Sequence, residues 1–536
     1  MKKLLFLSAA ALLTASGAFC QSKSFTLGKW TEIQGAILKE LNRSYVDSLP
    51  VDRIEKAGID AMLSELDPYT IFVPEEEGEG LEMMVSKSYG GIGAVIFKPD
   101  QQGNVIINEP YKGSPADKYG LKCGDEILAI DGATTHGLTT KECSDRMKGK
   151  PGTQVVFKIL KLRTRDTVDV KVTREKIHLP DIEYAGMLDS KTGYLLLSGF
   201  TEGVGKLVGT KFRELKAQGM ERFVLDLRGN GGGLLHEAVN IVSLFVPKGS
   251  LVVSAKGSLD SESREYRTSS EPIDTKMPII VMVDSGSASS SEIVTGALQD
   301  MDRATVMGTR TFGKGLVQGI RPLPYGGQLK ITTAKYYTPS GRCVQAIDYS
   351  HRNEDGSVGH IPDSLTHEFK TASGRPVRDG GGIKPDVEIK AHEYSRLVYS
   401  LVYNGVIEQY AMKYVRDHES IPSADEFKLD DNTYDDFIAF AKEKKFDYRS
   451  KAKALYDQMV EQLRKDGLEE GMKDNLKALE KSLELDKETF LRLKRNEIVP
   501  FIEEEIVVRY YFQEAGVKIR LRYDDQLREA LKSPTI

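Results

Sequence analysis

A run of serines follows an apolar, strand-like segment near the middle of the chain. Residues 279–283 (IIVMV) lead into the turn 284–291 (DSGSASSS), and a helical pattern begins at Glu292. Small residues at a strand-to-helix turn leave a hydroxyl exposed, and the helix N-terminus favours developing negative charge. This arrangement suits a nucleophilic serine, although by itself the run is more typical of an ordinary helix cap and turn.

A nucleophilic serine requires a base, and the candidate here is a lysine. The chain has eight histidines, none of which lies in a suggestive motif. Lys314 lies between two glycines in TFGKGLVQ (311–318), and burial, which disfavours an ammonium, would let it act as a general base. Gln318 would fix the amine by a hydrogen bond. The motif supplies three apolar neighbours, which are Phe312, Leu316 and Val317.

Two glycine-rich turns bear on the same chemistry. The strand-like LDLRGNGGG (225–233) runs into a helical pattern at 234–245, so free N–H groups in its turn would donate to an oxyanion. A phosphate cradle is the competing interpretation, but the dinucleotide fingerprint spacing is absent. The stretch GTRTFGKG (308–315) begins like a Walker A loop, yet Gly315 stands where the magnesium-binding Ser or Thr belongs, so nucleotide binding is not expected.

A third glycine-rich turn precedes the strand-like residues 95–97. Such a turn presents a row of N–H groups that hold a carboxylate, and the strand edge pairs with an extended peptide. By itself this is weak evidence, but GSPA with YGL (113–121) and GDEILAIDG (124–132) make residues 85–176 resemble a PDZ domain. The resemblance implies binding of a C-terminal carboxylate, with Ile92 and its neighbours shaping an apolar pocket. The peptide-binding residues would be Gly90, Gly91, Ile92 and Gly93.

The order of these elements resembles the C-terminal processing peptidases, also called tail-specific proteases. The resemblance covers about 30–390, and it implies a ClpP/crotonase-like α/β core with an inserted PDZ-like β domain and helical N- and C-terminal regions. Five stretches carry it: LDLRGNGGG (225–233), SGSASSSEIVTGALQD (285–300), GTRTFGKGLVQ (308–318), YYTPSGRCVQ (336–345) and GGGIKPDVEI (380–389).

The resemblance assigns the catalytic roles residue by residue. It implies that Ser289 is the nucleophile, Lys314 the base and Gln318 the residue that orients the lysine. Ser287 and Ser291 remain rival nucleophiles. No metal or cofactor is implied.

The same resemblance places the oxyanion hole on backbone N–H groups. These would belong to Ser290 and to either Gly232 or Gly233. The sequence departs from the family pattern at Ser290, where alanine is common, and at Gly231, where proline is often found. Neither departure removes a functional side chain.

Composition and patterning set the organisation of the chain. At 536 residues, with 40% hydrophobic and 29% charged residues, several cores are expected and a disordered chain is excluded. A net charge of −5 gives no support to nucleic-acid binding. The predicted fold class is therefore multidomain α/β. Its parts are a signal peptide (1–20), an N-terminal helical region (21–84), the PDZ-like domain (85–176), the α/β serine peptidase core (177–390) and a C-terminal helical region (391–536).

The N-terminus predicts export. A basic start, an apolar run over residues 4–15 and small residues before Cys20 have the layout of a secretory signal, and the run is short for a membrane span. Cleavage after Ala18 or after Cys20 fits, and the bulky Phe19 disfavours the lipoprotein alternative. We expect a periplasmic or cell-envelope protein. Of the later cysteines, Cys123 and Cys143 would be the pair to oxidise, although free thiols are the commoner case.

The main hypothesis is an exported serine endopeptidase that recognises substrate C-termini. Its partners would be proteins or peptides with accessible C-termini, and residues 391–536 would serve as a cap, an oligomerisation arm or an adaptor dock. The alternative is a PDZ-based scaffold with an inactive protease core, which the intact Ser289, Lys314 and Gln318 argue against. A small-molecule enzyme of crotonase type is a third hypothesis, disfavoured by the PDZ-like segment.

Overall fold

The computed structural model describes residues 24–533, except 79, 81–82, 84–85, 100–102, 354–356, 448–449 and 484–485. The predicted signal peptide lies outside the described residues. The chain divides into two compact units, with the boundary between Phe72 and Val73. The first unit is helical over 24–44 and in α2 (Val51–Ser64), and strand β1 (Ile71–Val73) follows. Asp67 accepts hydrogen bonds from the backbone N–H of Tyr69 and Thr70, which stabilises the turn between the helix and the strand.

The PDZ region is a β domain with a core of its own. In the strand over residues 154–160, residues buried on the core side alternate with exposed ones, as expected for a sheet with one covered face. Its elements are β2 (Ser88–Gly91) paired with β9 (Glu175–His178), the strands β3 (Ala94–Phe97), β4 (Val105–Pro110), β5 (Glu126–Ile130), β6 (Ala133–Thr134), β7 (Gln154–Leu160) and β8 (Thr167–Thr173), and the helices α4 (Pro115–Lys118) and α5 (Thr140–Met147).

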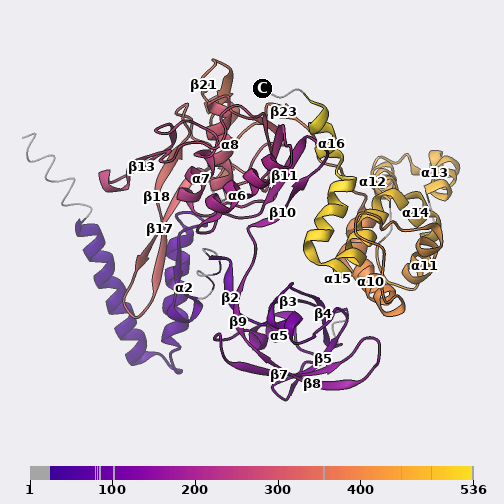
Figure 1. Cartoon of the computed structure of the whole chain (residues 1–536). Helices are drawn as coiled ribbons and strands as arrows, with labels where there is room; N and C mark the ends of the chain where they lie inside the picture. The colour runs from indigo at the N-terminus through magenta and orange to yellow at the C-terminus, as the bar shows by residue number, and fades with distance from the viewer. Residues whose placement is uncertain are drawn as a thin grey trace, which may run out of the picture. The chain divides into compact units, whose positions relative to one another are not determined.

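The peptidase core is built on a six-stranded sheet (Figure 1). The two central strands are buried on both faces, which is why FVLD and IIVMV read as continuous apolar runs. The strand order is β10 (Ile182–Met187), β11 (Thr192–Leu197), β12 (Arg222–Asp226), β15 (Ile279–Val283), β16 (Thr305–Gly308) and β23 (Val387–Glu388), parallel except for β10.

Helices cover both faces of this sheet. One face packs against α6 (Val204–Ala217), α7 (Leu235–Val242) and α8 (Ser290–Asp300), and every residue of α8 is buried. On the other face, Leu527 and Ala530 of α16 (Asp525–Lys532) contact a cluster from the central strands. The last helix of the chain therefore packs on the peptidase sheet, although the sequence placed it in a separate C-terminal region.

A second, antiparallel sheet lies beside the core. Its hairpin of β17 (Leu316–Pro322) and β18 (Gln328–Tyr337) extends through β13 (Leu251–Gly257) to β14 (Arg264–Arg267). The remaining short elements are the hairpins β19 (Ile347–Arg352) with β20 (Val358–His360) and β21 (Glu368–Lys370) with β22 (Pro376–Arg378), and the 3₁₀ turns Glu75–Glu77, Asp260–Glu262 and Asp363–Leu365.

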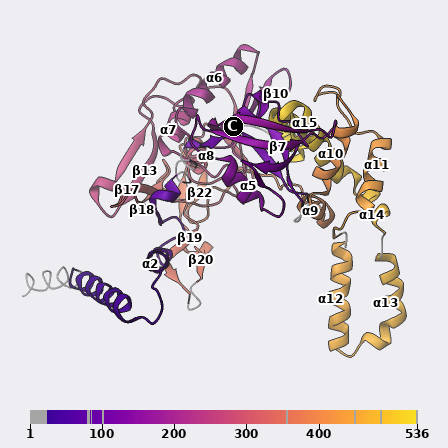
Figure 2. The same cartoon turned by 90° about the horizontal axis from the view of Figure 1, so that it is seen from below.

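The C-terminal region is helical, as predicted for residues 391–536. Residues 452–463 lie in one helix, whereas residues 476–494 divide between two. Figure 2 shows α12 and α13 side by side as a hairpin. The helices are α9 (Arg396–Tyr403), α10 (Val406–Asp417), α11 (Asp431–Lys442), α12 (Lys451–Lys465), α13 (Glu469–Leu483), α14 (Lys487–Leu493) and α15 (Arg495–Tyr523), which is kinked at Phe512.

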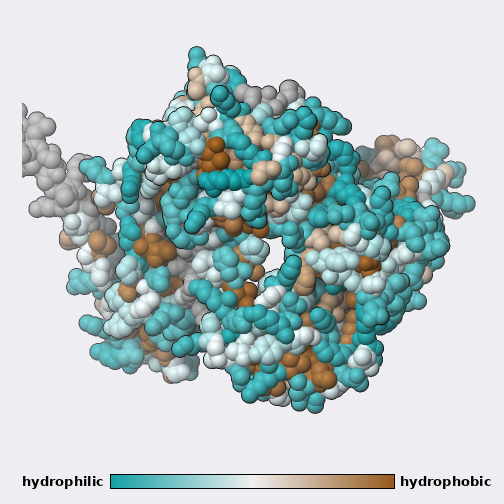
Figure 3. All heavy atoms as spheres, in the orientation of Figure 1, coloured by the Kyte–Doolittle hydropathy of each residue, from teal (hydrophilic) through white to brown (hydrophobic). Residues whose placement is uncertain are grey.

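Two expectations from the sequence concern a membrane span and a disulfide. The face in Figure 3 is mostly hydrophilic, with hydrophobic residues in separate patches. Among the described helices, none has the length and apolar character to cross a membrane. Cys123 and Cys143 are buried free thiols and Cys343 is a partly buried one, so the structure does not contain the alternative Cys123–Cys143 disulfide.

A charged network joins α16 to the loop after β12. The Arg228 guanidinium lies between the carboxylates of Asp226 and Asp524, each 2.5 Å from its Nη2. Asp524 also caps α16, because its Oδ1 accepts a hydrogen bond from Leu527 N–H. The end of the chain is thus fixed to the glycine-rich turn at 229–233.

We expect Asp524→Asn to lower the free energy of unfolding by about 1–2 kcal/mol, because it leaves Arg228 short of one anion while asparagine keeps the helix cap. Urea unfolding measures this change. Asp525→Asn is the control, since that carboxylate is exposed and its pair with Arg528 spans one helical turn; we expect about 0.5 kcal/mol or less. Equal effects of the two substitutions would contradict the assignment.

Candidate active site

Two loops meet where neighbouring parallel strands end. Residues 227–233 follow β12 and residues 284–289 follow β15, and the carboxyl ends of adjacent parallel strands lie at one edge of a sheet. The loops are bonded to each other: Ala288 N–H donates to Asn230 O at 3.0 Å, and Gly229 N–H donates to Asp284 Oδ1 at 2.8 Å. The glycine turn and the serine turn therefore form one structural unit.

Ser289 occupies a strained position at the start of α8. Its φ of 56° and ψ of −114° lie outside the regions that non-glycine residues normally adopt. The half-buried residue lines a cavity of about 350 Å³. The cavity is lined by Gly231, Gly232, Gly233, Leu234, Leu235, Ser289, Ser290, Ile293, Lys314, Leu316, Val317, Gln318, Ile320, Lys330 and Tyr336.

The rival nucleophiles lie elsewhere. Ser287 and Ser291 are fully buried, and neither lines the cavity. The Ser287 hydroxyl donates to Leu227 O at 2.7 Å, and that of Ser291 donates to Asn230 O at 2.8 Å. Both hydroxyls thus bind the two loops together, which leaves Ser289 as the candidate with access to a substrate.

Lys314 and Gln318 line the same cavity as Ser289. A register shift between Val317 and Gln318 marks a β-bulge, which re-aims side chains, and residues 316, 317 and 318 all face the cavity. The Gln318 side-chain nitrogen donates to Thr332 Oγ1 at 3.2 Å, so its orientation of the lysine stays a prediction.

The apolar setting of Lys314 differs from the predicted one. Phe312 was expected to contribute to it, but this ring is 45% exposed and does not line the cavity. Its backbone N–H donates to Ser287 O, which fixes the chain there while the side chain faces solvent. Leu316 and Val317 line the cavity as expected, and Ile293 and Tyr336 complete the wall from other elements.

Glu292 joins the nucleophile turn to the lysine turn. This carboxylate has no solvent exposure, and burial raises its pKa against the effect of its hydrogen bonds. No role of Glu292 was predicted from the sequence. The spacing Ser289–x–x–Glu292 is that of a capping box, in which the glutamate reaches back to the first N–H, and this signal would have found it. It accepts hydrogen bonds from Ser289 N–H (2.9 Å), Thr311 Oγ1 (2.6 Å), Gly313 N–H (2.8 Å) and Lys314 N–H (2.8 Å).

The predicted oxyanion donors are not equivalent. The Gly232 N–H donates to Asn230 Oδ1 at 2.9 Å, whereas no described residue accepts a hydrogen bond from the N–H of Gly233 or Ser290. Ser290 Oγ donates to Gly233 O at 2.8 Å, which holds these two residues together. Of the two glycine alternatives, the geometry therefore favours Gly233.

The predicted peptide-binding residues lie at the start of the PDZ domain. Gly90 and Gly91 belong to β2 and are paired with β9. The Ile92 side chain is 2% exposed and belongs to the PDZ core. The contribution of these residues, and of Gly93, to a carboxylate site stays a prediction.

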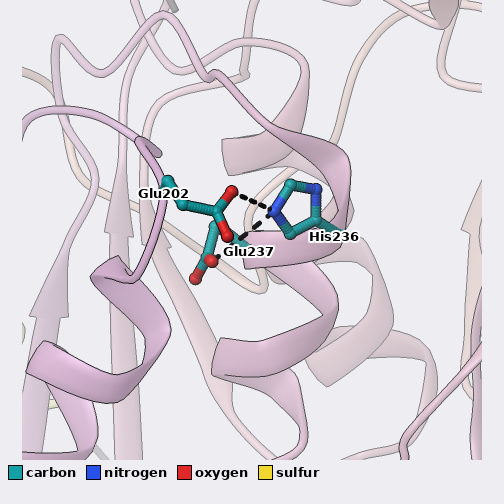
Figure 4. A group of neighbouring side chains, drawn as sticks. All are labelled: Glu202, His236 and Glu237. Atoms are coloured by element: carbon teal, nitrogen blue, oxygen red, sulfur yellow. Dashed lines mark hydrogen bonds and ion pairs between the residues drawn. The ribbon is translucent and has the colours of Figure 1, made fainter. Parts of the chain in front are cut away.

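One group of side chains has metal-ligand chemistry. Glu202, His236 and Glu237 lie together near the start of α7 (Figure 4), with His236 Nε2 2.9 Å from Glu202 Oε2 and 3.6 Å from Glu237 Oε1. The buried Glu237 accepts hydrogen bonds from Gly203 N–H and Gly205 N–H at the beginning of α6. A helix cap and a surface ion pair thus account for the group without a metal ion.

Comparison with known proteins finds matches to three parts of the chain. The profile of "Peptidase family S41" matches residues 191–350, that of "PDZ domain" matches 106–161, and that of "Probable PDZ-protease, C-terminal helical domain" matches 397–533. A carboxy-terminal-processing protease of Bartonella bacilliformis is 34% identical over 349 residues, which are 64% of this chain and 78% of that protein.

Two further relatives match a similar share of this chain. A probable CtpA-like serine protease of Staphylococcus aureus is 33% identical over 362 residues, which are 67% of this chain and 65% of that protein. The solved photosystem II D1 C-terminal processing protease is 28% identical, with a TM-score of 0.36, over 65% of this chain and 86% of that one.

The fold and the cavity define a PDZ-containing serine protease with an α/β core. The chain belongs to peptidase family S41, among the carboxy-terminal-processing proteases. The helical character predicted for residues 391–536 corresponds to a domain that other PDZ proteases carry.

We expect Gly232→Ala to lower kcat by about 100-fold or more, because a misplaced oxyanion site has effects of this size. Gly232 has a φ of +98°, and an added Cβ would lie 2.8 Å from Ser289 Cβ and 2.9 Å from Ser290 N. Gly231→Ala is the matched control, since its Cβ would meet nothing within 4 Å. Initial rates of peptide cleavage distinguish the two variants, and similar losses in both would contradict the assignment.

Proposed function

We propose that the chain cleaves peptide bonds with a Ser289–Lys314 dyad supported by Gln318. The observation that carries this proposal is the shared cavity: all three residues line it, beside Gly233 and Ser290, whose N–H groups donate to no acceptor in the described part of the chain. A nucleophile, a base and oxyanion donors around one space are the requirements of acyl transfer.

In this proposal the Ser289 hydroxyl attacks the scissile carbonyl carbon. The neutral Lys314 amine takes the hydroxyl proton, and the N–H groups of Gly233 and Ser290 stabilise the oxyanion. Lys314 then gives the proton to the leaving amine, and an acyl-enzyme remains on Ser289. A water molecule, deprotonated by the same amine, hydrolyses the ester.

The walls of the cavity support the role of the lysine. Leu235, Ile293, Leu316 and Val317 surround the space with apolar side chains, and an apolar setting disfavours an ammonium. The two buried serines next to Ser289 support its assignment as nucleophile, because their hydroxyls are already bonded to backbone carbonyls.

We further propose that the PDZ domain binds substrate C-termini and that the protein is exported. The glycine-rich residues 90–93 supply the backbone for a carboxylate site, and a PDZ domain complexed with peptide is known from a carboxy-terminal protease of Vibrio cholerae. The signal-like residues 1–20 support export to the periplasm or cell envelope. A homo-oligomer or an adaptor held by residues 391–536 stays a hypothesis.

A scaffold with an inactive core is the second candidate function. It requires that the PDZ domain binds peptides while the cavity turns over nothing. The intact dyad and the unbonded oxyanion donors argue against it, because a pure scaffold has no use for them.

The first test is cleavage of an unstructured protein that ends in apolar residues, with chain starting at residue 21. We expect Ser289→Ala and Lys314→Ala each to lower kcat by at least about 1,000-fold while peptide binding is retained. Ser285→Ala is the control, since Ser285 lies in the same turn but is exposed and outside the cavity. Cleavage that survives Ser289→Ala would refute the nucleophile, and binding without any cleavage by the unmutated chain would favour the scaffold.

The second test concerns export. We expect the full-length chain, expressed in a Gram-negative host, to be recovered from the cell envelope with an N-terminus at Phe19 or Gln21. Removal of the apolar run should retain the chain inside the cell, because the run is what a secretion machinery recognises. Edman sequencing and fractionation measure both results, and an intact Met1 on envelope protein would contradict the proposed cleavage.

A further inference from the structure

A single oxygen atom connects the proposed nucleophile with the proposed base. Glu292 Oε2 accepts hydrogen bonds from the backbone N–H of Ser289 at 2.9 Å and of Lys314 at 2.8 Å. These residues are 25 positions apart and belong to different loops. Because both N–H groups converge on one atom, the relative position of the two backbones depends on that atom.

The second oxygen fixes the approach to Lys314. Glu292 Oε1 accepts hydrogen bonds from Gly313 N–H and from Thr311 Oγ1, and Thr311 Oγ1 in turn accepts from Ile383 N–H. Three of the four donors to Glu292 are backbone N–H groups, which cannot accept. An ionised carboxylate satisfies all four donors, whereas an amide or a protonated acid would direct a hydrogen at one of them.

Other contacts surround Lys314 but do not replace this one. Gly313 O accepts a hydrogen bond from Ala346 N–H, and Gly315 N–H donates to Gln345 Oε1. These bonds fix the residues on either side of the lysine. Phe312 N–H also joins this loop to the serine turn by donating to Ser287 O, but the bond to Glu292 is the one that Lys314 itself makes with the helix that begins at the serine turn.

The hydrogen bond from Ser289 N–H to Glu292 also helps to hold Ser289 in a strained backbone conformation. A serine with φ of 56° keeps that conformation only where its surroundings impose it. Three hydrogen bonds hold its backbone here: Ser289 N–H donates to Glu292, and Ser289 O accepts from the Tyr336 hydroxyl at 3.2 Å and from Ile293 N–H at 2.9 Å.

We propose that Glu292 is a positioning residue of the protease: its buried carboxylate sets the distance between Ser289 and Lys314 and holds the serine in its strained conformation. The proposal deepens the proposed function and rests on the Ser289–Lys314 dyad. Glu292 touches no reacting atom, so its contribution lies in kcat and not in substrate binding.

The test compares Glu292→Gln with a matched substitution at Glu503. Glu503 is another buried glutamate, 1% exposed, which accepts hydrogen bonds from Leu429 N–H and the Tyr523 hydroxyl in the C-terminal region. We expect Glu292→Gln to lower kcat by about 100-fold with KM changed by less than about threefold, because a displacement of about 1 Å at reacting groups has this effect. Glu503→Gln should lower the melting temperature by a similar amount and leave kcat unchanged.

A second measurement does not depend on catalysis. In a Ser289→Ala background, hydrogen–deuterium exchange of residues 289–292 and 311–316 should become faster with Glu292→Gln and stay unchanged with Glu503→Gln. Unchanged exchange in these segments, or kcat within about threefold of the unmutated chain, would overturn the proposal. A kcat loss that disappears when both variants are assayed well below their melting temperatures would also overturn it, since it would reflect unfolding.

The outcomes separate this proposal from the proposed function. If the unmutated chain cleaves nothing, or if Ser289→Ala still cleaves, the dyad is wrong whatever the exchange experiment gives. If the dyad is established and Glu292→Gln behaves like Glu503→Gln, the dyad stands and the positioning role is wrong.

Discussion

The buried carboxylate of Glu292 is the interaction on which the proposed active site depends. A fully buried charge is tolerated only where hydrogen bonds compensate for the lost water, and here four donors do so. Those donors come from the turn before α8 and from the loop before β17. If either loop moved, the carboxylate would lose hydrogen bonds that compensate for its burial. This cost keeps Ser289 and Lys314 in their positions.

The remaining structure fixes the loops that this carboxylate joins. Adjacent parallel strands place the glycine turn and the serine turn at one edge of the sheet, and the Ser287 and Ser291 hydroxyls bond them together. Arg228 connects the glycine turn to Asp524 at the start of α16. The cavity therefore rests on a sheet whose second face is covered by the end of the chain. The C-terminal helical region thus contacts the peptidase core through α16, and α15 contacts β10 of the same sheet.

Binding and cleavage are assigned to separate parts of the chain. The PDZ domain has its own hydrophobic core, distinct from that of the peptidase sheet. In the proposed function, the substrate C-terminus binds to the PDZ domain and the scissile bond enters the cavity of the peptidase core. The two sites can therefore recognise different parts of the substrate. The chain carries both a PDZ domain and a family S41 peptidase core, and the proposed binding and cleavage sites lie on these two parts.

The sequence alone determined the family and the order of the main elements, and it singled out Ser289, Lys314 and Gln318, because these depend on local signals. Apolar runs predicted β12 and β15, glycine and serine turns predicted the loops after them, and the helical patterns predicted α7 and α8. Tertiary structure decided the rest. Phe312 and Leu316 look alike in sequence, yet only Leu316 lines the cavity: Leu316 begins β17, whereas the Phe312 backbone is bonded to Ser287 O in the loop before it and its side chain faces solvent. The return of α16 to the peptidase sheet, the bonding of Gly232 to Asn230 and the convergence of two loops on Glu292 all join residues far apart in the chain, and no local pattern encodes such contacts.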